Sequence, residues 1–221
     1  MRNLLLFLAA VMVTAASCSR STPDDHGCIE RTVIKLSDPG TNPAQTKTAD
    51  SLFDVNHIDH HHYRYLVLQA DTFKTQYPPY TQYDQKMVGV SQYVNGLRIL
   101  NSDVYYIFWN GATHYISGKP IQNASLDTVP YLSLRRLRTL FTNELNKPSG
   151  SVTPGLSDSC YKAEFGYYDL ADNQTAPNLV KAWRVTVMFS NLAYPYDGYP
   201  VAYFKDNGQL ISFSGNIISI D

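Results

Sequence analysis

Short apolar blocks alternate with polar residues between Gln92 and Lys119, and this pattern predicts a β-meander. Three apolar or aromatic runs are separated by polar breaks at Asn95-Gly96, Asn101-Ser102-Asp103 and Asn110-Gly111. Asn-Gly supplies the two positive-φ residues that a tight type I′ turn requires. The segment is therefore expected to form neighbouring antiparallel strands.

Further strands are predicted before this meander at residues 28–36, 63–69 and 87–94. Residues 37–50 are rich in Pro, Gly, Asn and Thr, which predicts a loop.

The segment from residue 71 to residue 86 is expected to be a long loop. Pro78 and Pro79 have no backbone N–H, which excludes a central strand there. Long ordered loops in compact domains are often functional, so Tyr77, Tyr80 and Tyr83 are candidate binding residues. Two interpretations stay open: these rings form a contact surface, or they fold back onto the sheet as a satellite core.

The second half is expected to begin with a helix and to continue as antiparallel strands. One apolar stripe comprises Leu134, Leu137, Leu140, Phe141 and Leu145. Pro148 and Gly150 are expected to end this helix. Strands are predicted at residues 160–170, 180–189, 199–205 and 209–214, with alternation clearest around Trp183. The fold class is therefore α+β, with a helix packed on a sheet at least in the second half.

The first 18 residues resemble a bacterial lipoprotein signal. Arg2 precedes an apolar run of ten residues, which is too short to span a bilayer, and small residues then lead to Cys18. Cys18 is the expected site of lipidation, and the alternative is cleavage just before a plain thiol. Residues 19–27 are expected to be a tether. The chain is thus expected to be exported and anchored to a bacterial membrane, either in the periplasm or at the cell surface.

Net charge and tyrosine content indicate which kinds of partner the protein is expected to bind. A formal net charge of −1 without a basic stripe argues against nucleic acid, and leaves the lipid as the only expected membrane contact. Arg135, Arg136 and Arg138 are expected to form the solvated face of the helix. The 17 tyrosines fit a sheet with one wet face or an aromatic platform for a glycan or peptide.

The remaining residues with reactive side chains do not indicate catalysis. Cys28 and Cys160 form a disulfide in one interpretation and are separate thiols in the other. His57, His60, His61 and His62 fit either a metal site or a group of solvated histidines, and no metal is expected. The sequence contains no His-Glu-x-x-His, nucleophile elbow or P-loop. No catalytic residue and no cofactor are therefore expected, and the protein is not expected to be an enzyme.

The meander resembles the propeptide module of fungalysin and thermolysin proteases. The resemblance is carried by Gln92, Asn95, Gly96, Leu97, Ile99, Ser102, Asp103 and Val104. Met87 and Gly89 replace a His and an Arg of the family pattern, while Arg98 replaces its Pro and Asn101 its Gly. The segment 182–187 and the hairpin Lys205-Asp206-Asn207-Gly208 are similar to the PepSY module that commonly follows.

These resemblances imply two cystatin-like modules, each an antiparallel meander, at residues 28–122 and 123–221. They imply a non-catalytic lipoprotein that binds a protein partner, as an inhibitor or chaperone of a peptidase encoded separately. The alternative is a cell-surface protein that binds a glycan or a peptide.

Overall fold

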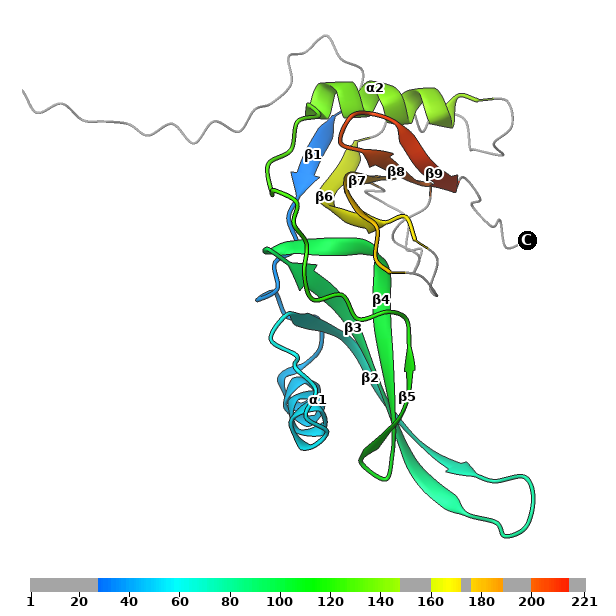
Figure 1. Ribbon diagram of the computed structural model, residues 1–221. Helices are drawn as coiled ribbons and strands as arrows, with labels where there is room; N and C mark the ends of the chain where they lie inside the picture. Colours follow the sequence, from blue (N-terminus) through cyan, green and yellow to red (C-terminus); the bar gives the residue numbers. More distant parts are fainter. Residues whose placement is uncertain (1–27, 148–159, 172–175, 189–199, 215–221) are drawn as a thin grey trace, which may run out of the picture.

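The computed structural model describes residues 28–147, 160–171, 176–188 and 200–214 (Figure 1). The predicted leader, Cys18 and the tether lie outside these residues. Within the described part, neither helix has the length and hydrophobicity needed to cross a membrane.

The described residues form two helices and nine strands, so the predicted α+β class is confirmed. The helices are α1 (Pro43–Val55) and α2 (Leu134–Leu145). The strands are β1 (Ile29–Thr32), β2 (Tyr63–Lys74), β3 (Gln82–Val94), β4 (Leu97–Trp109), β5 (Ala112–Ser117), β6 (Tyr161–Asp169), β7 (Leu179–Val187), β8 (Val201–Lys205) and β9 (Leu210–Ser214).

The first layer consists of the antiparallel meander β2–β5 with α1 packed on one face. Phe53 of α1 is fully buried, and its ring contacts the rings of Tyr65 and Tyr106. The turns at Asn95-Gly96 and Asn110-Gly111 have positive φ at all four residues, as the sequence predicted. This layer has its own core, made of Ala49, Leu52, Phe53, Tyr63, Tyr65, Val88, Val90, Val104, Tyr106 and Phe108.

Helix α1 corrects the prediction of a loop at residues 37–50. The side chain of Asn42 accepts a hydrogen bond from the backbone N–H of Gln45, and Pro43 occupies the first helical turn. Asn at the N-cap and Pro at the first position favour a helix start, although both residues are also typical of loops. The buried Ala49, Leu52 and Phe53 then hold the helix on the sheet.

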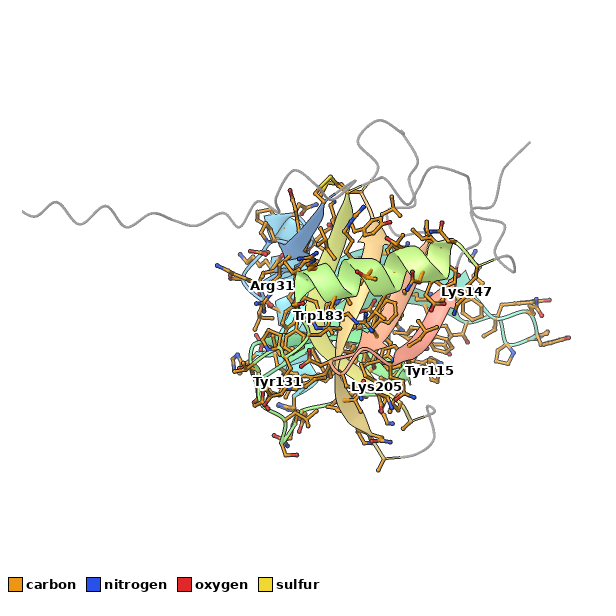
Figure 2. The ribbon with its side chains drawn as sticks, turned by 90° about the horizontal axis from the view of Figure 1, so that it is seen from above. Arg31, Tyr115, Tyr131, Lys147, Trp183 and Lys205 are labelled. Carbon is orange, nitrogen blue, oxygen red and sulfur yellow. A yellow bond between two sulfur atoms is a disulfide. The ribbon has the colours of Figure 1, made fainter. Side chains whose placement is uncertain are left out.

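The second layer consists of the antiparallel meander β6–β9 with α2 packed on one face (Figures 1 and 2). Ser133 caps α2, and Leu137, Phe141 and Leu145 are buried against the sheet, which confirms the predicted helix and its stripe. Arg138 is not on the solvated face. It is buried, donates to the carbonyl of Cys28 and lies 4.5 Å from the centre of the Tyr161 ring.

The two meanders join into one nine-stranded sheet through strand pairs at their junction. Strand β4 belongs to the first meander but pairs in parallel with β6 at Ile99 and Tyr167. Strand β1, predicted within the first module, pairs in parallel with β6 over residues 161–164. The side-chain amide of Asn101 donates to the carbonyl of Asp169 and accepts from its N–H, which fixes the junction.

Residues 71–86 form a hairpin arm and not the predicted irregular loop. Strands β2 and β3 stay paired as far as Lys74 and Gln82, and only residues 75–81 connect them. The arm projects away from both helices (Figure 1). The prolines at 78 and 79 lie in this connection, where no ladder hydrogen bond is required.

Candidate binding surface

Gln92 is buried at the end of β3, where it bonds Ser102, Lys119 and Ile121, and we call these four residues the corner. Ser91 pairs with Asp103 while Tyr93 pairs with Arg98, so four residues, 99–102, lie opposite Gln92 alone. Its amide nitrogen donates to the Ser102 carbonyl, the Ser102 hydroxyl and the Lys119 carbonyl at 2.9–3.0 Å. Its amide oxygen accepts from the Ile121 N–H. Gln92 therefore satisfies the Ser102 carbonyl within this large bulge and joins it to the backbone of Lys119 and Ile121, which follow β5.

Asp206 has the same role in the second layer. Its carboxylate accepts hydrogen bonds from the backbone N–H groups of Tyr131 and Leu132 and from the indole N–H of Trp183. These bonds fasten the segment before α2 to the sheet. The residues that carried both family resemblances thus hold the fold together, and neither Gln92 nor Asp206 is exposed.

The face of the first sheet opposite α1 is rich in aromatic side chains, and we call it the aromatic face. Its members are Phe73, Tyr83, Tyr105, Trp109, His114 and Tyr115. Trp109 is central: its ring centre lies 3.4 Å from that of His114, 4.6 Å from Tyr83 and 5.6 Å from Phe73. Tyr115 is 56% exposed and Phe73 41%. The strand register places Phe73 beside Tyr83, and Tyr115 beside Ile107, two residues before Trp109. His114 lies at the irregularity in β5 and joins this face through its ring contact with Trp109.

Gly89 makes room for this packing. A Cβ atom at position 89 would lie 2.8 Å from both the Tyr105 ring and the Val67 side chain. The absence of a side chain at Gly89 therefore leaves room for the Tyr105 ring beside β3.

The tip of the arm presents two tyrosines to solvent. Tyr77 is 78% exposed and Tyr80 is 72% exposed. Thr75 organises the connection between them: its hydroxyl donates toward the carbonyls of Tyr77 and Pro79 and accepts from the Thr81 N–H. Of the two interpretations left open by the sequence, Tyr77 and Tyr80 fit the exposed surface, whereas Tyr83 packs on Trp109.

Side chains occupy backbone groups along both outer strands of the first sheet. On β5, Asn56 donates to the Gly111 carbonyl and accepts from the Thr113 N–H. On β2, Gln45 donates to the Leu68 carbonyl, and Asp71 accepts from the N–H of Thr72. Such capping protects edges from strand addition. These bonds protect the start of β5 and the Leu68 position of β2 from strand addition.

The histidines at positions 60–62 lie in the turn that leads into β2. Residues 60–62 precede β2, so they are not on the extended strand that would put His60 and His62 on one face. No group of three or more His, Cys, Asp or Glu side chains in the described ranges is placed to hold a metal ion. His60 instead makes hydrogen bonds to Asp54 and Tyr65.

Cys28 and Cys160 form a disulfide, with their Cα atoms 4.4 Å apart. The bond joins the start of β1 to the start of β6. Of the two interpretations of these cysteines, the structure has the bonded pair.

One buried carboxylate, Glu164, lies at the junction of the layers. Burial raises the pKa of Glu164, and the guanidinium groups of Arg98 and Arg184, 3.7 and 3.9 Å away, oppose that shift. Neither carboxylate oxygen has a hydrogen-bond partner within the described part of the chain. A neighbouring cavity of about 30 Å³ has room for about one water molecule.

Phe73, Trp109, His114 and Tyr115 were not among the candidate residues chosen from the sequence. Alternation within residues 104–109 indicates that Trp109 shares a face with Tyr105, but only the strand register brings Phe73 and Tyr83 to it.

We compared the chain with models of protein families, with curated proteins and with solved structures, and none of them matches it.

Proposed function

We propose that this protein is a non-catalytic, exported lipoprotein that binds a protein partner through its hairpin arm and aromatic face. The observation that carries the proposal is the pair Tyr77 and Tyr80, held at the tip of an ordered arm with most of their surface in solvent. Tyrosine supplies a large contact area and loses little conformational freedom on binding, so it recurs in protein-binding surfaces.

The arm is built in a way that suits docking. The Thr75 hydroxyl shares its one hydrogen between the carbonyls of Tyr77 and Pro79 and accepts from the Thr81 N–H, so a partner meets a structured loop. The face beside it carries exposed aromatic rings and continues from the arm into the body of the sheet. Contiguous exposed apolar surface of this kind commonly marks an interaction site.

The resemblance to protease propeptide modules supports a peptidase as the partner and a cystatin-like architecture for each layer. In this proposal, the arm covers the entrance to the cleft of a separate peptidase, and the aromatic face rests beside it. The capped edges argue for docking through side chains and not through an added β-strand.

A glycan has weaker support as the ligand. A sugar ring stacks on a free aromatic face, but the Trp109 ring is covered on one side by His114 at 3.4 Å. The Phe73 ring also packs against Trp109, at 5.6 Å, so neither ring presents two free faces.

The test is affinity capture from an envelope extract of the cell that makes the protein. The wild type is compared with the double variant Tyr77→Ser/Tyr80→Ser and with Tyr131→Ser, a control at an equally exposed tyrosine outside the arm. The expected result is one captured protein lost only in the double variant. Equal capture by all three forms would refute binding through the arm. Capture of polysaccharide alone would favour the glycan alternative.

A further inference from the structure

His60 connects α1 to the first sheet. Its Nε2 atom lies 3.1 Å from a carboxylate oxygen of Asp54 on α1, and its Nδ1 atom lies 2.9 Å from the hydroxyl of Tyr65 on β2. Tyr65 in turn donates to Asp50, also on α1, at 2.6 Å. The imidazole is mostly buried, with 18% of its side-chain surface exposed.

The donors in this cluster determine the protonation of His60. A tyrosine hydroxyl has one hydrogen, and the hydroxyl of Tyr65 gives its hydrogen to Asp50. The bond between Tyr65 and His60 therefore needs a hydrogen on Nδ1. The carboxylate of Asp54 only accepts, so the second bond needs a hydrogen on Nε2. Both bonds form together only when His60 is an imidazolium.

The other groups around His60 leave Asp50 and Asp54 as its main charged partners. The ring of Phe53 on α1 packs at 5.5 Å, and the ring of exposed His61 stacks at 5.7 Å. Asp59 and His62 complete the turn before β2. Burial lowers the pKa of His62, which favours its neutral form and reduces repulsion of a charge on His60.

We propose that His60 is a proton-dependent tether between α1 and the first sheet. As an imidazolium it bonds Asp54 and Tyr65 at the same time. When it loses a proton, either Asp54 loses its donor, or Tyr65 turns its hydroxyl to His60 and leaves Asp50. Deprotonation therefore always breaks one link to α1.

The state of His60 also affects the β5 edge of the sheet. Asn56 follows α1 directly and bonds the backbone of Gly111 and Thr113. A helix that opens more often also uncovers this edge more often. This role of His60 follows from its hydrogen bonds and does not depend on the partner proposed above.

Two measurements on the full chain test the tether. Nitrogen-15 spectra of the histidine rings, recorded from about pH 5 to about pH 8 where histidines usually titrate, are expected to show both His60 nitrogens protonated at the acid end. Over the same range, after correction for intrinsic exchange, the opening of α1 amides is expected to increase about tenfold, as for loss of one hydrogen bond to a charged group.

Two variants separate the tether from general pH effects. His60→Gln is expected to abolish the increase in α1 opening, and His57→Asn, which removes an exposed histidine at a positive-φ position, is expected to leave it unchanged. A His60 ring with one protonated nitrogen throughout the range would overturn the proposal. So would α1 opening that does not change with pH in the wild type.

Discussion

Strand β3 connects two regions of opposite character. At its inner end the polar Gln92 has no exposed surface, and at its outer end the arm leads to Tyr80 and Tyr77, which are among the most exposed side chains described. The polar residue is buried because a bulge needs its hydrogen bonds, whereas the aromatic residues are exposed although burial would favour them. Gln92 and its partners therefore serve the fold, and the arm is the better candidate for function.

The largest effect is expected from breaking the covalent link that supports the inner region. Replacing both Cys28 and Cys160 with Ser removes a bond between residues 132 positions apart. The chain-entropy model predicts a loss of about 5 kcal/mol in the free energy of unfolding for a loop of this length. Urea denaturation of the variant and of the oxidised wild type measures it, and partner capture at low temperature is expected to persist. A loss below about 1 kcal/mol would mean that the bond contributes little to the fold.

Gln92→Leu is expected to be the next most damaging change. The substitution preserves most of the volume but leaves Ser102, Lys119 and Ile121 with unsatisfied backbone groups. The expected loss is about 3 kcal/mol in the free energy of unfolding. Gln82→Leu, at an exposed position of the arm, is the control and is expected to change stability by less than about 0.5 kcal/mol. Similar losses in both variants would remove the distinction between corner and arm.

The double variant Tyr77→Ser/Tyr80→Ser tests whether the exposed arm contributes to the stability of the fold. Because both rings are mostly in solvent, the free energy of unfolding is expected to change by less than about 0.5 kcal/mol. The melting temperature by calorimetry checks this alongside the capture experiment. A loss of several kcal/mol would show that the rings form part of a core.

The effect expected at Glu164 depends on pH. Burial raises the pKa of this carboxyl above that of the unfolded chain, so the folded state binds the proton more tightly. The associated stability is present below the ordinary carboxyl pKa and is lost as pH rises through the higher folded pKa. Denaturation of the wild type and of Glu164→Gln at a series of pH values measures the difference, which is expected to move in favour of the variant as pH rises. Parallel curves would contradict it.

The sequence predicted those elements that the spacing of apolar residues or a turn dipeptide determines locally. The stripe of Leu137, Phe141 and Leu145 identified α2, and the Asn-Gly pairs identified two turns. It did not predict α1, because Asn42 and Pro43 suit a loop as well as a helix start, and burial of Phe53 decides between them. Arg138 was placed on the wrong face because only the fold brings Tyr161 and Cys28 to it.

The candidate surface was predicted in part for a similar reason. Tyr77 and Tyr80 were identified from the prolines between them, which mark a connection in any fold. Phe73, Trp109 and His114 gather only after β2, β3, β4 and β5 have found their register, and register between strands is a tertiary property.

The position of the disulfide has a mechanical consequence. Cys28 comes first in the described chain, ahead of β1, so a pull on the preceding residues reaches the fold at this point. The force then passes through a covalent bond into β6, which is held between β1 and β7 and touches β4. The four residue pairs between β1 and β6 are bypassed, so they cannot be unzipped one at a time from that end. Reduced protein would lack this path, and the same pull would peel β1 away from the sheet.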